Sequence, residues 1–139
     1  MLLVYRLIIN CIIFLSPIII LIRLIKIKEH PTRFKEKFCI TSKTRGNGNI
    51  IWFHGSSVGE ILSVIPLIRE LEKNRNIQKI LVTSSTLSSS SIFEKIKLKK
   101  TIHQFFPIDS NYLTNKFLNF WKPSMAIFIE SEIWPNMYC

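Results

Sequence analysis

The chain has 139 residues, which is enough for one domain of ordinary size with little to spare. Its formal net charge is +10, and 47 % of its residues are hydrophobic. A balance this basic favours an anionic partner, which can be nucleic acid, anionic lipid headgroups or a phosphorylated substrate. The three histidines and three cysteines form no metal-ligand motif, and the odd number of cysteines indicates reduced thiols, as in a cytosolic setting.

The first segment, residues 2–24, is almost wholly apolar, and between residues 7 and 22 the only polar interruptions are Asn10 and Ser16. A membrane-spanning helix needs about 20 apolar residues. This run qualifies if the Arg6 side chain extends to the interface. No small-residue cleavage site follows, which favours a retained anchor over a signal peptide. A monotopic helix sunk into one leaflet is the alternative.

Residues 23–45 form a basic segment, in which eight lysines and arginines face two glutamates and leave a net charge of +6. By the positive-inside rule, this flank is expected on the cytoplasmic side of the membrane. A basic cluster beside a membrane segment is attracted to anionic lipid by about 1 kcal/mol per charge. We therefore expect inner-membrane anionic lipid as a partner, with a plain solvated face as the alternative, and the charge does not require nucleic acid.

Beyond a loop rich in Gly and Asn at residues 44–49, short apolar runs alternate with segments of helical spacing. Strands are expected at residues 50–53, 79–83, 102–106 and 125–129. Helices are expected at residues 58–73, 87–99 and 112–121, the first kinked or bounded by Pro66. This alternation predicts an α/β fold with right-handed βαβ units and a parallel sheet. The chain is expected to stop where a further α/β unit would begin, because Pro135 suits the first turn of a helix.

Polar residues follow three of the expected strands, at the edge where ligands bind in open α/β sheets. After the first strand, small residues and the free N–H groups of a helix start favour an anion. The candidates in this turn are His54, Ser56, Ser57, Gly59 and Glu60. Ser57 and Glu60 also have the spacing of a helix capping box, which by itself would account for Glu60.

Two further strand ends carry candidate groups. Thr83 and Thr86 offer hydroxyls to a polar ligand, or else cap the following helix. Glu130 and Glu132 close the fourth expected strand. Because alternate residues of an extended segment point to opposite faces, one carboxylate can face a ligand while the other pairs within the fold. Such carboxylates suit acid/base chemistry or hydroxyl binding.

Glu36 lies among the cationic residues Arg33, Lys35 and Lys37. Cationic neighbours favour the charged form of a carboxylate. Composition alone makes local charge pairing the simplest interpretation of this residue.

Taken together, these segments resemble the N-terminal part of bacterial 3-deoxy-D-manno-octulosonic acid (Kdo) transferases. An apolar, anchor-like start precedes five motifs in the family's order, at residues 33–38 (RFKEKF), 52–60 (WFHGSSVGE), 83–86 (TSST), 106–109 (FPID) and 129–136 (IESEIWPN). Each motif is weak alone, and SSVGE and ESEIWPN behind the apolar start are specific as a set. The chain departs from the family where Lys37 and Cys39 replace the usual Arg and Gly, and it covers only about the first third of a family member.

The resemblance implies an inverting glycosyltransferase of the GT-B type, with two Rossmann-like domains facing each other across a cleft. The N-terminal domain would bind the acceptor, the lipid A precursor, and the C-terminal domain would bind the donor CMP-Kdo, with no metal or other cofactor. Glu36 would be the general base that deprotonates the acceptor hydroxyl. Acceptor or substrate binding would fall to His54, Ser56, Ser57, Gly59, Glu60, Thr83, Thr86, Glu130 and Glu132.

We therefore expect a membrane anchor helix at residues 1–24, a basic juxtamembrane segment and loop carrying Glu36 at residues 25–49, and a truncated Rossmann-like domain at residues 50–139. The expected location is the cytoplasmic face of the inner membrane. Without the donor domain the chain alone is expected to be inactive, so a separately encoded C-terminal half is a further expected partner. The alternative is a non-catalytic, membrane-bound fragment that retains only acceptor or lipid binding. An unrelated nucleotide-binding protein is disfavoured, because HGSSVG is not the GxGxxG fingerprint.

Overall fold

A parallel sheet of four strands, in the order β3-β2-β1-β4, is the centre of the computed structural model, which describes residues 2–41, 43–129 and 134–137. The strands are β1 (Ile50–His54), β2 (Lys79–Ser84), β3 (Thr101–Phe105) and β4 (Met125–Phe128). Trp52 of β1 pairs with Leu81 of β2 on one side and with Ala126 of β4 on the other. The chain therefore reverses its direction of travel across the sheet at β1, and open α/β sheets bind ligands at such a switch point. The predicted α/β class and parallel sheet are confirmed.

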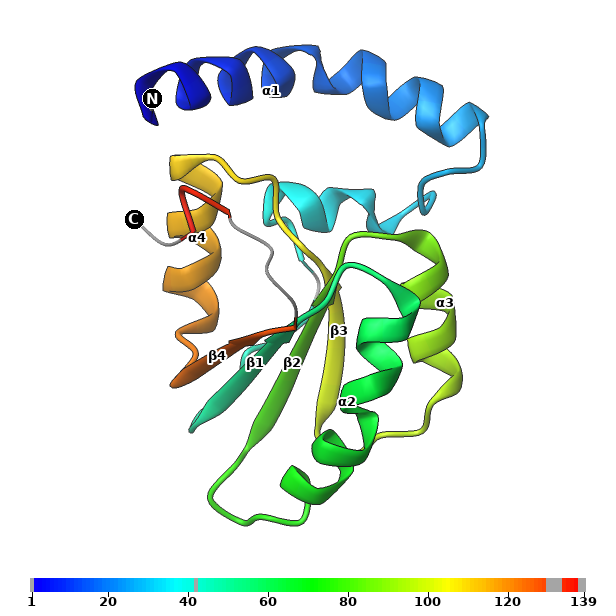
Figure 1. Ribbon diagram of the computed structural model, residues 1–139, viewed down its shortest axis with the longest axis vertical. Coiled ribbons are helices and arrows are strands. Elements are labelled where there is room, and N and C mark those ends of the chain that lie inside the picture. Colours follow the sequence, from blue (N-terminus) through cyan, green and yellow to red (C-terminus); the bar gives the residue numbers. More distant parts are fainter. Residues whose placement is uncertain (1, 42, 130–133, 138–139) are drawn as a thin grey trace.

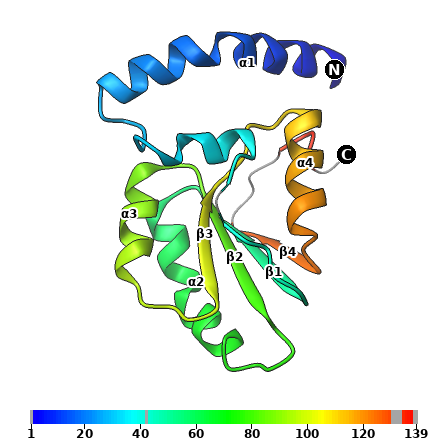
Figure 2. The ribbon, with the colours of Figure 1, turned by 180° about the vertical axis from the view of Figure 1, so that it is seen from behind.

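Helices cover both faces of this sheet (Figures 1 and 2). On one face lie α2 (Val58–Leu71) and α3 (Leu87–Lys95), and on the other lies α4 (Asn111–Trp121). Each of the three helices begins at a hydroxyl side chain that accepts a hydrogen bond from the backbone N–H three residues later; these caps are Ser57, Thr86 and Ser110.

Two apolar clusters hold the helices on the sheet. Because alternate residues of a strand point to opposite faces, Phe53 packs in one cluster and Trp52 in the other. The cluster under α2 and α3 includes Ile61, Ile65, Ile68, Ile80, Val82 and Phe93. The cluster under α4 includes Ile50, Leu81, Phe106, Phe117 and Trp121. Full burial of one such side chain stabilises the fold by about 1.5–3 kcal/mol.

The helix predicted at residues 58–73 is confirmed as α2, and the one predicted at residues 87–99 is shorter than expected. Of the two alternatives for Pro66, a kink or a boundary, the boundary is excluded, because α2 continues through it to Leu71. The isoleucines at positions 61, 65 and 68 pack on the sheet on both sides of the proline, which holds the helix in place. The helix expected at residues 87–99 ends at Lys95, because Ile96 leaves the helical conformation and packs against the same core.

The N-terminal part of the chain lies across the top of the sheet in Figure 1. The long helix α1 (Leu2–Ile25) passes above the carboxyl ends of the strands, and the short 3-10 helix η1 (Arg33–Phe38) lies between α1 and the sheet (Figures 1 and 2). The segment Leu3–Ile25 contains an 18-residue window with a mean hydropathy of 2.6 and is long enough to cross a membrane, judged by length and composition.

Candidate functional site

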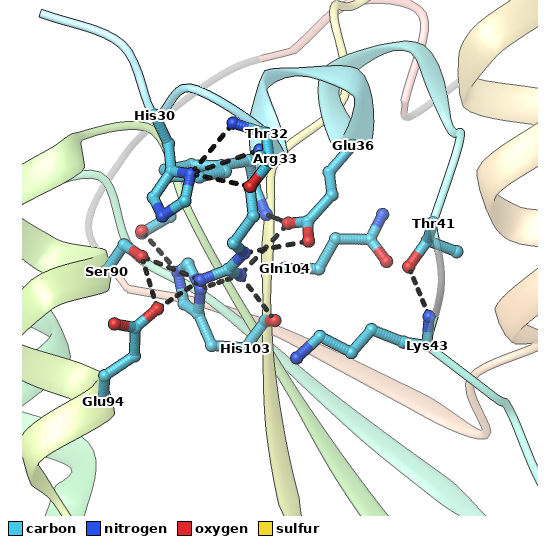
Figure 3. Close-up of polar contacts among 12 residues, drawn as sticks. His30, Thr32, Arg33, Glu36, Thr41, Lys43, Ser90, Glu94, His103 and Gln104 are labelled. Atoms are coloured by element: carbon cyan, nitrogen blue, oxygen red, sulfur yellow. Dashed lines mark hydrogen bonds and ion pairs between the residues drawn. The ribbon is translucent and has the colours of Figure 1, made fainter.

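Glu36 is buried in η1, with 4 % of its surface exposed, and both of its carboxylate oxygens are held (Figure 3). Arg33 Nε donates to Oε1 at 2.9 Å, and Arg33 Nη2 donates to Oε2 at 3.1 Å. The backbone N–H of Phe105, the last residue of β3, donates to Oε2 at 2.9 Å. A carboxylate offers about four lone-pair positions. One position on Oε1 is therefore left without a hydrogen-bond partner from the described residues.

Arg33 connects this carboxylate to the sheet and to α3 (Figure 3). Its Nη1 donates to Ser90 Oγ at 3.0 Å and to Glu94 Oε1 at 2.6 Å. Its Nη2 donates to the backbone oxygen of His103 at 3.0 Å, and the guanidinium lies over the Phe105 ring at 5.1 Å. The planar, multiply donating guanidinium can hold several acceptors in a fixed arrangement, which an ammonium cannot. Arg33 therefore links Glu36 to α3, and it reinforces the direct hydrogen bond between Glu36 and β3.

His103 is a neutral member of this network. Burial, together with the positive charges of Arg33 and Lys43, lowers the pKa of its imidazole to about 3. Its Nδ1 lies 2.8 Å from Arg33 Nη2, and because a guanidinium only donates, Nδ1 accepts. The ring hydrogen is therefore on Nε2, which donates to Ser84 Oγ at 2.7 Å.

Cys39 ends η1 in the left-handed backbone conformation, with φ at 55°. In this conformation the backbone N–H of Cys39 donates to the backbone carbonyl oxygen of Glu36 at 2.9 Å. The backbone N–H of Ile40 donates to the carbonyl oxygen of Lys35 at 3.2 Å. The Cys39 thiol donates to the Leu113 oxygen at 3.2 Å, and burial raises its pKa to about 11. Cys39 stands where the resembling family has glycine, and the backbone nevertheless keeps the angle that glycine adopts readily.

His54 and Thr83, predicted to bind the acceptor, are fully buried and contact each other. His54 Nδ1 lies 2.9 Å from Thr83 Oγ1, and the same oxygen accepts a hydrogen bond from Trp52 Nε1 at 2.9 Å. The His54 ring stacks on Phe106 with centroids 3.9 Å apart. These contacts join the carboxyl ends of β1 and β2, so both residues have a structural role at this edge.

The turn after β1 forms the predicted cap. The backbone N–H of Glu60 donates to Ser57 Oγ at 3.2 Å, and Glu60 Oε2 accepts from the backbone N–H of Ser56 at 2.8 Å. Gly59 is exposed, and a Cβ added there would meet no atom within 4 Å, whereas one at Gly55 would lie 3.1 Å from Glu60 Cβ. A Cβ at position 55 would therefore require neighbouring side chains to shift, whereas position 59 has open space.

Three predicted binding residues remain, Thr86, Glu130 and Glu132. Thr86 caps α3, accepting from the backbone N–H of Ser89 at 3.2 Å. Glu130 and Glu132 lie outside the described residues.

Among the hollows that the described residues line, three carry polar groups at this edge. A pocket of about 300 Å³ is lined by Glu36 with Thr32, Arg33, Lys35, Ile40 and Thr41. A second, of about 470 Å³, is lined by Arg23, Ile27, Lys28 and Leu87 and by the hydroxyl residues Ser85, Thr86, Ser88 and Ser91. A third, of about 220 Å³, shares Ser85 and continues under α1, lined also by Ile9, Lys37, Phe106, Pro107, Ile108, Asp109 and Trp134. Cations and hydroxyls suit a phosphorylated, hydroxyl-rich ligand. In the described part of the chain, no group of three or more His, Cys, Asp or Glu side chains is placed to hold a metal ion.

The sequence analysis did not identify Arg33, Glu94 or His103 as site residues. The three-residue spacing of Arg33 and Glu36 was a usable signal, because residues i and i+3 share a face of a 3-10 helix. His103 lies 70 residues from Arg33, and no local pattern connects the two.

The sheet order, its switch point and its polar carboxyl edge define a Rossmann-like α/β domain. A family model described as 3-deoxy-D-manno-octulosonic-acid transferase (kdotransferase) matches residues 32–139. The chain therefore belongs to the Kdo transferase family, whose N-terminal domain is of the GT-B type.

Individual relatives agree with this assignment. The 3-deoxy-D-manno-octulosonic acid transferase of Rickettsia bellii is 43 % identical over 119 residues, which are 86 % of this chain and 28 % of the relative. The probable mitochondrial transferase of Arabidopsis thaliana is 37 % identical over 109 residues, covering 78 % and 24 %. The transferase of Haemophilus influenzae is 31 % identical over 87 residues, covering 63 % and 20 %. The chain thus spans between 20 % and 28 % of the length of these three relatives.

Proposed function

We propose that this chain is the acceptor-binding part of an inverting glycosyltransferase that transfers Kdo from CMP-Kdo to the lipid A precursor. The observation that carries the proposal is the Glu36 carboxylate, which borders a pocket at the carboxyl edge of the sheet with one lone-pair position left over. Family membership supplies the class of reaction.

In the proposed reaction, Glu36 accepts the proton of an acceptor hydroxyl. The acceptor oxygen then forms a bond to the anomeric carbon of Kdo, and the bond from that carbon to the CMP phosphate breaks, so that CMP leaves with the electron pair. The clamp formed by Arg33 and the Phe105 N–H keeps the carboxylate in one orientation toward the pocket. A fixed base lowers the barrier because its geometry is set before the reaction.

The acceptor is proposed to place its reacting hydroxyl in the Glu36 pocket, with the rest of the molecule extending beneath α1, where two hollows share Ser85. Arg23 and Lys28 line the larger hollow beside hydroxyl side chains, which suits the phosphate and sugar groups of a phosphorylated glycolipid. Gly59 leaves room at the start of α2 for a ligand to approach the backbone. The contact between His54 and Thr83 and the caps of α2 and α3 are proposed to hold the carboxyl edge of the sheet in the shape that the acceptor meets.

CMP-Kdo is proposed to bind a C-terminal domain of the family, so transfer would require that domain as a partner polypeptide. The chain is proposed to act at the cytoplasmic face of the inner membrane, where exposed Lys26, Lys28 and Lys35 would attract anionic lipid. The basic charge is accounted for in this way without nucleic acid as a partner.

A second candidate is a non-catalytic module that binds the acceptor or lipid and transfers nothing. The observation that favours it is that the Glu36 carboxylate already accepts three hydrogen bonds, two from Arg33 and one from Phe105, as a structural carboxylate does.

The test is an assay with CMP-Kdo and the lipid A precursor, run with and without the C-terminal half of the Rickettsia bellii relative. We expect no transfer by the chain alone and transfer by the combination. Glu36→Gln should abolish transfer by the combination, whereas the matched Glu70→Gln, on the exposed side of α2, should leave it unchanged. Transfer by Glu36→Gln at the unsubstituted rate would remove Glu36 from the role of base, and no transfer by any combination would favour the second candidate.

A further inference from the structure

We propose that α1 lies in the plane of the membrane, with its outer face embedded in one leaflet of anionic lipid and its inner face docked on the carboxyl edge of the sheet. The orientation of the helix is independent of the proposed function. Only the placement of Glu36 at the membrane surface rests on that function. Length and composition alone favoured a helix that spans the bilayer.

Both ends of α1 are attached to the domain by hydrogen-bonded polar side chains. Near its start, Tyr5 Oη donates to Asp109 Oδ2 at 2.7 Å, and Arg6 Nε donates to Asn136 Oδ1 at 2.9 Å. The backbone N–H of Asn136 in turn donates to Asp109 Oδ2 at 3.1 Å, and Asn136 Nδ2 donates to the backbone carbonyl oxygen of Asp109 at 2.8 Å. These four contacts form a closed network at the start of α1.

At the other end, a buried glutamate joins α1 to η1. Arg23 Nε lies 2.8 Å from Glu29 Oε2, and Lys37 Nζ of η1 lies 2.7 Å from Glu29 Oε1. Glu29 is 4 % exposed, so its two cationic partners neutralise a carboxylate that has lost its water. The helix is thus fixed at two points along its length.

The residues of α1 divide between an inner and an outer face. The less exposed positions recur at the three- and four-residue spacing of a helix face; they are Tyr5, Ile9, Ile13, Ser16, Ile20 and Leu24. The polar side chains of Arg6 and Arg23 are also on the less exposed side. Large apolar side chains cover the outer face, with exposures of 81 % for Leu3, 65 % for Leu7, 85 % for Phe14, 61 % for Ile18 and 74 % for Ile25.

A helix standing across the bilayer would break the network at Tyr5 and Arg6. With 24 residues α1 is about 36 Å long, close to the hydrocarbon thickness of about 30 Å. Tyr5 would then lie at the opposite membrane surface from Asp109, whose buried Oδ1 already has no hydrogen-bond partner among the described residues. Loss of the tyrosine hydroxyl would remove one of the hydrogen bonds that the Asp109 carboxylate accepts.

A leaflet is the occupant that suits the outer face. Basic residues directly beside an apolar helix are attracted to anionic headgroups. Lys26 and Lys28 follow α1 directly and are exposed, so they can reach anionic headgroups while the apolar face enters the acyl region. The carboxyl edge of the sheet, and Glu36 with it, would then face the membrane from which a glycolipid headgroup projects.

Cross-linking in vesicles tests this orientation. In a background with Cys11→Ser, Cys39→Ser and Cys139→Ser, we place Ile9→Cys on α1 and Ile108→Cys at the sheet edge, since both residues line the same hollow. The full chain is bound to vesicles of phosphatidylcholine and phosphatidylglycerol in equal parts and treated with a short bismaleimide reagent. We expect cross-linking of most of the vesicle-bound chain, to the same extent as in detergent. The control pair Phe14→Cys with Ile108→Cys should not cross-link, because Phe14 points away from the domain.

Cross-linking in detergent but not in vesicles would overturn the proposal, because it would show that the helix leaves the domain when it enters lipid. Failure of the chain to float with the vesicles, including association with a second copy instead, would also overturn it. If the first pair prevents folding, Ile9→Cys with Pro107→Cys probes the same hollow. No readout depends on sugar transfer, so this experiment can fail while the proposed function stands, and the converse also holds.

Discussion

Arg33 and Glu36 form a two-point ion pair, with Nε to Oε1 at 2.9 Å and Nη2 to Oε2 at 3.1 Å. Nη1 of the same guanidinium donates to Glu94 and Ser90 of α3. A motion of α3 relative to η1 would therefore change the position of Arg33 and, with it, the hydrogen bonds to the Glu36 carboxylate. The predictions below start from this pair.

Arg33→Lys should separate charge from geometry at the clamp. Lysine keeps the positive charge but cannot bind both oxygens of Glu36 together with His103 and Glu94. We expect a loss of about 1–3 kcal/mol in the free energy of unfolding, because buried acceptors lose their donors. Urea unfolding measures this change.

The matched control is Arg69→Lys on the exposed face of α2, where we expect a change below about 0.5 kcal/mol. In the complemented transfer assay, Arg33→Lys should also lower turnover about tenfold or more, since a misplaced base transfers protons poorly. Equal stability of the two variants would contradict the role assigned to the clamp.

His103 should make the protein less stable in mild acid. The pKa of its imidazole is lowered from 6.5 to about 3, so the unfolded chain binds a proton that the folded chain refuses. The free energy of unfolding should therefore rise with pH between about 3 and 6.5. Above this range the contribution of His103 to stability is fully present. Lowering the pH from 7 to 5 should cost on the order of 2 kcal/mol from this residue.

The measurement is urea unfolding at several pH values for the unsubstituted chain and for His103→Gln. Because glutamine does not titrate, the variant should lose this part of the pH dependence while keeping hydrogen-bonding capacity. Parallel curves for the two proteins between pH 5 and 7 would show that folding does not lower the pKa of His103.

Substitution of Cys39 reports the cost of its left-handed backbone. Cys39→Ala keeps the φ of 55° on a residue with a Cβ, whereas Cys39→Gly relieves it, and both remove the thiol. We expect the glycine variant to be more stable than the alanine variant by about 1 kcal/mol in urea unfolding. At the exposed helix position Ser63 the order should reverse, with alanine more stable than glycine by a similar amount. A glycine variant no more stable than alanine at position 39 would show that the angle is not strained.

Gly59 and Gly55 should respond oppositely to alanine. A Cβ at position 59 meets nothing within 4 Å, so Gly59→Ala should leave stability unchanged or raise it by up to about 1 kcal/mol. If the acceptor approaches the backbone there, the same variant should bind the lipid A precursor several-fold more weakly. A Cβ at position 55 would lie within 3.1–3.3 Å of Glu60, Ile129 and Ile61, so Gly55→Ala should destabilise the fold. Unchanged acceptor binding by Gly59→Ala would remove this glycine from the proposed site.

Tyr5→Phe should loosen the start of α1 without changing the core. The variant removes one hydrogen bond to the Asp109 carboxylate, which we expect to weaken docking by about 1–2 kcal/mol. Hydrogen exchange of residues 2–12 in detergent should accelerate relative to the unsubstituted chain. Tyr112→Phe, at a side chain that is 74 % exposed, is the control and should change nothing. Equal exchange in both variants would show that Tyr5 does not hold the helix.

The order of elements was readable from the sequence because it depends on local patterns. Short apolar runs predicted all four strands of the sheet, and the Ser57–Glu60 spacing predicted the cap of α2. Helical spacing predicted a helix over residues 58–73 but left open whether Pro66 would kink or bound it, and the isoleucines that pack against the sheet on either side of the proline decide that the helix continues. Burial of an apolar helix face outweighed the local preference of one residue.

The sequence by itself determined the α/β class, the family and the candidate base, because hydrophobic periodicity and short motifs are local properties of the chain. Only the tertiary structure decided that Glu36 is clamped by Arg33 and joined through it to His103 and α3. It also decided that α1 lies along the domain, through Tyr5 and Asp109, which are 104 positions apart in the chain. Contacts between distant residues follow from how helices pack on the sheet, and that packing is a property of the whole fold rather than of any segment.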